Sequence, residues 1–483
     1  MTPAVVVLEL NELAPHLVRR WVHLGLLPGF ARLFDQSVSF TTEAREAPGL
    51  LEPWIQWVTV HSGLDYEAHQ VYERGTGHRL QAPRLWDMVT AAGGTSWICG
   101  SMNTGIVGGR LNGALVPDLA STQEGFPAGE FDDFLAFLRS SVFDAHAVPQ
   151  RRPTPRELTA FTRYMLANGL SKKAMKQALR LFVGGGAHHT SWDRAMLRDR
   201  LLWDLFQSRW SRLRPHLATV FLDSAAQLHR SHWHRQGPES MQIKPTADEQ
   251  VRYSQAVLEA YKAMDEMVSQ ALRMVDESAA SLVLVSALNQ QPVSTTPAPR
   301  ETQIFRAHDP MQLLGIAGVE VPAVLEPGRG DETRLVFESI GAARKVQQAL
   351  SALQLGAEPL LQVRLDGHSV YMSCAIATAP PPDARITARA GHSVATFREM
   401  FRLARTVRSG SDQREGLLLV RPVGGGKARQ GGRVPLRQVA PTLAALTGMS
   451  PSDIAYYFEL PPLAPAVGVR TERRTRQRDS VGV

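Results

Sequence analysis

The chain of 483 residues has little cysteine and no long apolar run. Its two cysteines, Cys99 and Cys374, are far apart in apolar, strand-like surroundings, which excludes a disulfide framework and indicates a reducing, cytoplasmic setting. No apolar run reaches the length of a membrane span, and no charged and apolar leader pattern opens the chain. We therefore expect a cytoplasmic protein without a membrane span.

The composition is that of a folded globular protein, with 44% hydrophobic and 20% charged residues. The length is large for one hydrophobic core, so we expect either a main domain with insertions or two domains.

The net charge of +7 is unevenly distributed. Residues 461–483 are rich in arginine and poor in apolar side chains, which predicts a disordered basic tail. A solvated tail without a dedicated partner is the simplest interpretation, and contact with an anionic surface is the alternative. We expect no nucleic-acid partner.

A second basic region runs from Arg151 to Arg214. Its apolar residues Met175, Leu179 and Phe182 recur at helical spacing, which predicts helices with solvated basic faces. The alternative is a basic cap that attracts an anionic substrate.

The start of the chain indicates the main fold. Residues 5–8 are four apolar β-formers, typical of a buried parallel strand. Glu9, Asn11 and Glu12 follow, and a helical pattern begins near Pro15. Polar residues between a buried strand and a helix lie at the carboxyl edge of an α/β sheet, where such folds bind ligands. We expect Asn11 to lie at a site.

Further along the chain, strand and helix patterns alternate. Strands are predicted at 37–42, 96–99, 218–222, 281–285 and 416–420, and helices at 53–62, 84–92, 249–277 and 439–448. The pattern predicts an α/β fold with a doubly wound, mostly parallel sheet sandwiched by helices, a helical insertion and a smaller α+β insertion. We expect the core domain to be formed by three separate segments, residues 1–125, 216–290 and 409–460. A helical insertion or cap is expected at 126–215 and an α+β insertion at 291–408. The tail is expected at 461–483.

Three blocks carry a resemblance to a known family: Leu10-Asn11-Glu12 at the end of the first strand, Ser62-Gly63 followed by His69, and Val439-Ala440-Pro441-Thr442-Leu443. In this order they resemble the alkaline phosphatase superfamily, most closely its type I phosphodiesterase/nucleotide pyrophosphatase-like members. The resemblance covers the core blocks, about half the chain. It implies an alkaline-phosphatase-like fold with two metal ions at strand ends and a Thr or Ser nucleophile.

Most of the implied metal ligands are replaced here. The first Asp falls on Asn11, and the last His falls on Asp412. An Asp-x-x-x-His pair falls on Ala225 and His229, and an Asp-His pair falls on Ala287 and Leu288, so His229 is the one clear ligand that is kept.

The nucleophile position falls on Pro53 by ungapped counting, or on Glu52 with a shift of one residue. Asn11 and Asp412 could still bind a metal through oxygen.

A narrower branch of uncharacterised alkaline-phosphatase-like proteins is similar in its opening, in the block around Glu52, and in residues 286–290. This resemblance implies that Asn11, Glu52, Gln56 and Gln290 form a rebuilt site. We take Gln56, Asn289 and Gln290 as candidate substrate-binding residues.

Each candidate also has a purely structural interpretation. Glu52 precedes Pro53, so it could be a helix N-terminal carboxylate. His229 with His232 and His234 could bind a metal or form ordinary hydrogen bonds. Asp412 could be a turn residue.

Two functions stay open. In the first, the chain is a homologue degenerate at the two-metal site, non-classical or inactive, which binds a small anionic ester or a protein partner, or regulates a related active enzyme, without a metal. In the second, it is a hydrolase or transferase of phosphate or sulfate esters that uses one divalent ion, Zn²⁺ or Mn²⁺. The first predicts a site filled by apolar side chains. The second predicts that Asn11, Glu52, His229 and Asp412 converge on one pocket.

Overall fold

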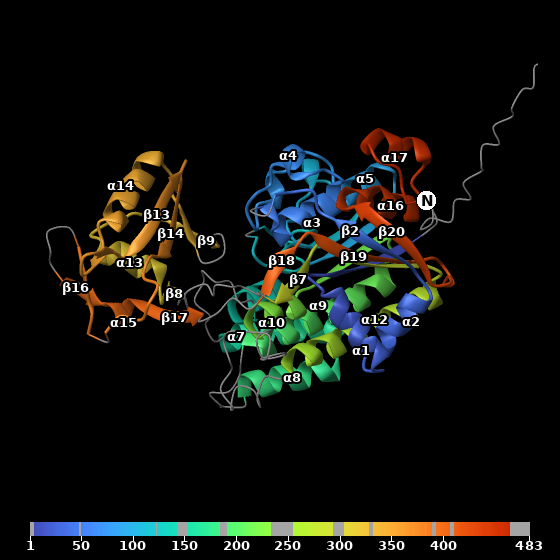
Figure 1. Ribbon diagram of the computed structural model, residues 1–483, viewed down its shortest axis with the longest axis horizontal. Helices are drawn as coiled ribbons and strands as arrows, with labels where there is room; N and C mark the ends of the chain where they lie inside the picture. Colours follow the sequence, from blue (N-terminus) through green and yellow to red (C-terminus); the bar gives the residue numbers. More distant parts are fainter. Residues whose placement is uncertain are drawn as a thin grey trace, which may run out of the picture.

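The structure is a computed structural model that describes residues 4–47, 50–121, 123–142, 153–183, 191–232, 255–292, 304–327, 332–381, 383–388, 393–405 and 410–463. Its main domain is a sheet covered by helices on both faces, and an α+β insertion lies to one side (Figure 1). The predicted basic tail beyond Leu463, and the start of the helix predicted at 249–277, lie outside these residues.

The central sheet has eight strands in the order β20-β2-β19-β6-β1-β5-β3-β4. The strands are β1 (Val5–Leu10), β2 (Val38–Glu43), β3 (Ser96–Cys99), β4 (Gly113–Val116), β5 (Leu217–Leu222), β6 (Ser281–Ser286), β19 (Glu415–Arg421) and β20 (Arg429–Pro435). Strand β1 pairs in parallel with β5 and β6, and β19 alone runs against its neighbours β6 and β2. The predicted mostly parallel α/β fold is confirmed.

Strand β1 is buried on both faces, which explains its uninterrupted apolar sequence. Val6, Leu8 and Leu10 face one core and Val5 and Val7 face the other. The first core is covered by α1 (Pro15–His23), α2 (Pro28–Asp35), α9 (Ser191–Leu213) and α12 (Ala256–Ser278). The second is covered by α3 (Pro53–Ser62), α5 (Leu85–Ala91), α16 (Val439–Leu446) and α17 (Pro451–Tyr457).

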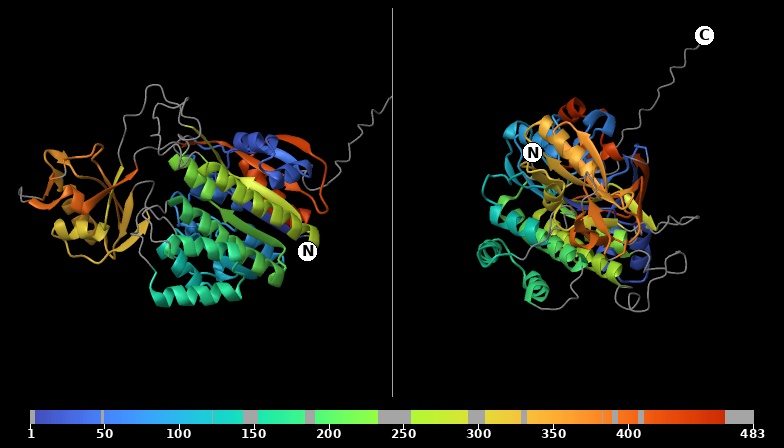
Figure 2. Two further views of the ribbon diagram at one scale, coloured as in Figure 1. Left: turned by 90° about the horizontal axis from the view of Figure 1, so that it is seen from below. Right: turned by 90° about the vertical axis from the view of Figure 1, so that its left-hand side faces the viewer.

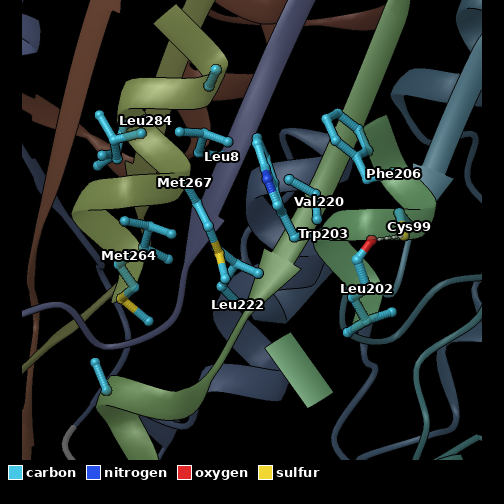
Figure 3. Close-up of a cluster of buried hydrophobic side chains, with 14 of the residues drawn as sticks. Leu8, Cys99, Leu202, Trp203, Phe206, Val220, Leu222, Met264, Met267 and Leu284 are labelled. Carbon is cyan, nitrogen blue, oxygen red and sulfur yellow. Dashed lines mark hydrogen bonds between the residues drawn. The ribbon is translucent and has the colours of Figure 1, made fainter. Parts of the chain in front are cut away.

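Large side chains fill the first core. Figure 3 shows Trp203 and Phe206 of α9 beside Val220 of β5, with Met264 and Met267 of α12 nearby. Cys99 lies in the same layer, where its thiol donates to the Leu202 carbonyl oxygen at 3.6 Å. Both cysteines are free thiols, and burial raises the pKa of Cys99 well above its usual value.

The segment predicted as a helical insertion contains α6 (Asp132–Phe137), a π-helical turn (Leu138–Val142), α7 (Pro155–Ala167), α8 (Lys172–Val183) and α9. Helix α9 packs directly on β5 and β3, so it belongs to the layer that covers the sheet. Helix α7 packs on α6 through Phe161 and Phe137, whose rings stack with centroids 3.8 Å apart.

The α+β insertion has its own hydrophobic core. Its elements are β8 (Ile304–Ala307), α13 (Pro310–Ile316), β9 (Val324–Pro327), β10 (Thr333–Val336), α14 (Ile340–Ser351), β11 (Gln354–Leu355), β12 (Glu358–Pro359), β13 (Leu361–Asp366), β14 (Ser369–Cys374), β15 (Arg385–Thr387), β16 (Ser393–Thr396), α15 (Phe397–Met400) and β17 (Phe401–Arg405).

The insertion is joined to the main domain at the edge of the sheet. The chain leaves through β7 (Asn289–Pro292) and returns through β18 (Gly410–Gln413), and these two strands pair antiparallel. A second contact involves Glu73 of the main domain, which accepts from Arg334 Nη1 at 2.9 Å and from the Tyr371 hydroxyl.

Short helices complete the described segments: α4 (Tyr66–His69), α10 (Ser224–His232) and the 3-10 turns Gly77–Arg79, Val107–Gly109 and Leu436–Gln438. None of the helices in these segments has the length and apolar character needed to cross a membrane.

A glycine allows β19 to lie close to β6 where the insertion begins. A Cβ atom on Gly416 would approach the Ala287 carbonyl oxygen to 2.7 Å and the Ser286 carbonyl more closely still. We expect Gly416→Ala to lower the free energy of unfolding by about 1–3 kcal/mol, measured by urea denaturation, because the two strands must separate.

The matched control is Gly315→Ala in α13, where an added Cβ would meet nothing within 4 Å. Alanine there should leave stability unchanged or raise it by about 0.5–1 kcal/mol. Equal losses in the two variants would contradict this account of β19.

Candidate functional site

Polar residues gather where β1, β5 and β6 end. Asn11 follows β1, Asp223 follows β5, and Ser286 ends β6. Because these strands are parallel neighbours, the three residues lie at one edge of the sheet. From β1 the chain continues to one side of the sheet at β2 and then to the other at β3, and doubly wound folds bind ligands at such a switch point.

The Asn11 side chain is engaged at both ends. Its Oδ1 accepts from the Trp57 indole N–H at 2.9 Å, and its Nδ2 donates to Asp223 Oδ1 at 2.7 Å. Asn11 is 1% exposed. The carbonyl oxygen predicted to bind a metal therefore accepts a hydrogen bond from α3, and a metal role for Asn11 stays a prediction.

A buried arginine completes this network. Arg198 of α9 donates from Nη2 to Asp199 Oδ1 at 2.8 Å and from Nη1 to Asp223 Oδ2 at 3.4 Å. Burial alone would lower the pKa of Arg198, but the charges of Asp199 and Asp223 outweigh it, and the pKa lies above its usual value. The guanidinium is therefore charged.

The Asp199 carboxylate ties α9 to the end of β5. Its Oδ2 accepts from the backbone N–H of Ser224 at 2.8 Å and of Asp223 at 3.1 Å. Gln227, one turn into α10, donates to Asp223 Oδ2 at 3.1 Å. Both oxygens of Asp223 thus accept from nitrogen donors.

Sequence reasoning missed Asp199 and Trp57 as site residues, and it placed Arg198 among solvated basic faces. That expectation is wrong for Arg198, which is 3% exposed. The sequence feature that could have indicated a buried Arg198 is its pairing with Asp199 between the apolar residues Leu197 and Leu201 of one helix. A charged pair inside an apolar stripe is typical of a buried ion pair.

A second network lies beside the first. Gln290 Nε2 donates to Glu12 Oε2 at 2.8 Å and to Asp412 Oδ1 at 3.2 Å. Gln290 and Asp412 are direct partners in the β7–β18 ladder. Glu12 is fully buried and has a φ of 49°, a left-handed conformation that is rare for residues other than glycine and often marks a functional position.

The three candidate substrate-binding amides share one property. The side-chain nitrogen of each donates a hydrogen bond. Gln56 donates to the Leu50 carbonyl at 3.1 Å and Asn289 to the Glu415 carbonyl at 2.7 Å. Gln290 donates to Glu12. Their side-chain oxygens are buried and have no hydrogen-bond partner within the described segments. Buried acceptors of this kind call for a donor.

Glu52 lies at the N-cap position of α3 and is half-buried. Its backbone carbonyl accepts from the Ile55 N–H at 2.9 Å, but its side chain does not cap the helix. A nucleophilic role stays a prediction.

His229 is fully buried in α10. Its Nε2 lies 3.1 Å from the Tyr261 hydroxyl, which also accepts from the Ala14 N–H at 2.9 Å. Burial raises the pKa of Tyr261. The contact joins α10, α12 and the start of α1. The side chains of the other predicted histidines, His232 and His234, lie outside the described residues.

A buried pair of a carboxyl group and an imidazole joins β1 to α3. Glu9 Oε1 is 2.9 Å from His61 Nε2, and both residues are 1% exposed. The His61 ring lies between Trp57 and Trp86, with centroid distances of 5.9 and 5.1 Å. Removing either partner would leave the other polar group buried in an apolar layer.

The first network does not fit a divalent cation. Within the described segments no group of three or more His, Cys, Asp or Glu residues is placed to hold a metal ion. A dication about 4 Å from the Arg198 guanidinium would be repelled by about 8 kcal/mol at an effective dielectric constant of about 20. The Asn11 and Asp223 oxygens already accept hydrogen bonds.

Comparisons with known proteins find matches for this chain among solved structures only. No known family pattern matches it, and no curated protein sequence matches it. Among solved structures, human ectonucleotide pyrophosphatase/phosphodiesterase 5 is 10% identical with a TM-score of 0.39, over 92% of this chain and 95% of that chain. Phosphonoacetate hydrolase from Sinorhizobium meliloti 1021 is 11% identical with a TM-score of 0.40, over 92% and 96%. Similarity this slight says nothing about chemistry.

The buried His69 should make stability depend on pH. Its Nδ1 accepts from the Val71 N–H at 3.0 Å, and burial, followed by the charge of Arg84, lowers its pKa from 6.5 to about 4. As the pH falls, the His69 imidazole is therefore protonated in the unfolded chain before it is protonated in the folded one. The free energy of unfolding should fall between pH 6.5 and pH 4, by at most about 3 kcal/mol.

In His69→Asn, whose side-chain oxygen can accept from Val71, this part of the pH dependence should disappear from urea denaturation curves. The control is His23→Asn, an exposed position on α1, which should keep the full profile. An unchanged slope in His69→Asn would show that another group controls acid stability.

Proposed function

We propose that this chain is an alkaline-phosphatase-like protein whose strand-end site contains its own guanidinium in place of metal ions. It binds a small anionic ester or a protein partner and does not hydrolyse phosphoesters by two-metal chemistry. The resemblance of three core blocks supports the family, and the contact of Arg198 with Asp223, whose other oxygen accepts from Asn11, carries the proposal.

Charge balance supports this proposal. In a two-metal site, carboxylates offset the charge of the cations, and the cations polarise the ester. Here one guanidinium faces two carboxylates, Asp199 and Asp223, and all three are almost fully buried. The guanidinium offsets one of the two negative charges, and hydrogen bonds from Asn11, Gln227 and two backbone N–H groups stabilise the carboxylates further. An inactive homologue was expected to have apolar side chains at this site. The structure has a hydrogen-bonded network of polar side chains there instead.

The buried amide oxygens indicate what a ligand would need. Gln56, Asn289 and Gln290 each present an unpartnered oxygen within the described segments. A ligand with hydroxyl or ammonium groups could donate to them.

A second candidate function rests on Glu12 and Asp412. These two carboxylates approach one carboxamide, that of Gln290. Rotation of that amide would present its oxygen between them, and carboxylate and amide oxygens bind divalent cations. This arrangement supports an altered, single-metal hydrolase or transferase.

Metal analysis of the purified protein separates the two functions. If the proposal holds, neither Zn²⁺ nor Mn²⁺ is present at stoichiometry, added metal leaves the melting temperature unchanged, and bis-p-nitrophenyl phosphate is not turned over. A metal that binds only the folded state would raise the melting temperature by mass action. Metal at stoichiometry, with hydrolysis abolished by Gln290→Leu but not by an exposed Gln81→Leu, would establish the single-metal function instead.

Replacing the buried arginine should be costly. Arg198→Met would leave Asp199 and Asp223 buried without their cation, and we expect the free energy of unfolding to fall by about 3–5 kcal/mol. The exposed Arg110→Met should change it by less than about 0.5 kcal/mol. Equal, small effects in the two variants, measured by urea denaturation, would mean that Arg198 does not compensate the site.

A further inference from the structure

Helices α7 and α8 are consecutive along the chain and lie on the outside of the main domain, α7 against α6 and α8 against α9, and together they are called the α7–α8 hairpin. Their inner faces are anchored: Phe161 and Met165 of α7 and Ala174 of α8 are buried, and α8 packs against α9. The connection between them is fixed as well, because Asp204 of α9 accepts from the Ser171 N–H at 2.9 Å. Figure 2 shows this pair at the periphery of the domain, beyond the helices that cover the sheet.

Both helices of the hairpin expose large apolar side chains. Of the ten large hydrophobic side chains that are exposed in the described segments, four lie here: Leu158 at 41%, Leu166 at 67%, Met175 at 53% and Leu179 at 60%. Single exposed hydrophobic residues are common on protein surfaces, and four of them within two consecutive helices support an interaction surface here. Met175 and Leu179 are one turn apart and share a face of α8.

The same hairpin is strongly basic. It carries six cationic side chains and one carboxylate, Glu157, which is used in the N-terminal cap of α7. The cations are Arg156, Arg163, Lys172, Lys173, Lys176 and Arg180. Within the described residues only Lys173 pairs with a carboxylate, Glu266. Lys172 and Lys176 flank the Met175–Leu179 face at helical spacing.

We propose that the α7–α8 hairpin docks on the surface of an anionic lipid bilayer. Lysines and arginines that have no carboxylate partner among the described residues complement anionic head groups, and the leucine and methionine side chains can enter the boundary between head groups and acyl chains. A nucleic acid would use the cations without the aliphatic side chains. On α8 the helical spacing places Met175 and Leu179 on the same side as two lysines, and this combination of cations and apolar groups fits a lipid interface.

Docking by this surface places no helix across the membrane. The inner faces of α7 and α8 stay packed on the domain, so only side chains enter the interface. This inference concerns a surface formed by α7 and α8 and does not depend on the proposed function.

Vesicle co-sedimentation of the full chain tests the proposal. We expect binding to phosphatidylcholine vesicles that contain phosphatidylglycerol, weaker binding to pure phosphatidylcholine, and loss of binding at high salt. The triple variant Lys172→Glu, Lys176→Glu, Arg180→Glu should bind at least about a hundredfold more weakly, since each cation near an anionic surface contributes about fivefold. Leu166→Ser with Leu179→Ser should also weaken binding, with the cations intact.

Matched controls separate the hairpin from other charges. Arg344→Glu with Lys345→Glu changes exposed cations on α14, and Leu24→Ser with Leu26→Ser changes exposed leucines after α1. Both should bind vesicles as the unaltered chain does. A further variant measures how much the tail contributes to vesicle binding. In it, glutamine replaces the tail arginines Arg470, Arg473, Arg474, Arg476 and Arg478. Thermal melting verifies that every variant is folded.

Three outcomes would overturn the proposal. The first is undiminished vesicle binding by the folded hairpin variants, and the second is binding that only the tail variant loses. The third is binding to heparin or an acidic protein that depends on the cations but not on Leu166 and Leu179, with none to vesicles. That result would assign the surface to a soluble polyanion.

Discussion

The contact between Arg198 and the carboxylates of Asp199 and Asp223 holds the site together. It joins α9, which covers one face of the sheet, to the end of β5 beside β1. The three groups are buried, and a buried ion pair is stable only when its remaining donors and acceptors are satisfied. Here Asn11, Gln227 and two backbone N–H groups provide those bonds. Loss of one member would therefore affect the others.

The second network depends on where the α+β insertion enters. Strands β7 and β18 pair antiparallel at the carboxyl edge of the sheet, and their register places Asp412 opposite Gln290. The left-handed conformation of Glu12 brings its carboxylate to the same amide. The base of the insertion and the candidate site are thus one structural unit. The contact of Glu73 with Arg334 and Tyr371 gives the insertion a second attachment.

The strand-end site and the α7–α8 hairpin use basic residues in different ways. On α9, Arg198 is enclosed and compensated, so its charge orders the interior. On α8, the cations are exposed, and among the residues that the structure describes only Lys173 has a carboxylate partner, so their charge can act on a partner. Sequence composition treats both as one basic region. Burial separates a structural cation from a recognition surface, because an exposed charge keeps its water while a buried one must find a counter-charge.

The amino-acid sequence by itself determined the layered α/β architecture. Apolar runs such as residues 5–8 specify strands buried on both faces, and the polar residues that follow them mark the carboxyl edge of the sheet. Asn11 was predicted as a site residue for this reason, whereas Gln290 and Asp412 were predicted from the family resemblance. Only the tertiary structure decided their partners. Trp57, Arg198 and Asp199 come from distant helices, and their approach depends on helix packing and side-chain direction, which local patterns along a chain do not encode.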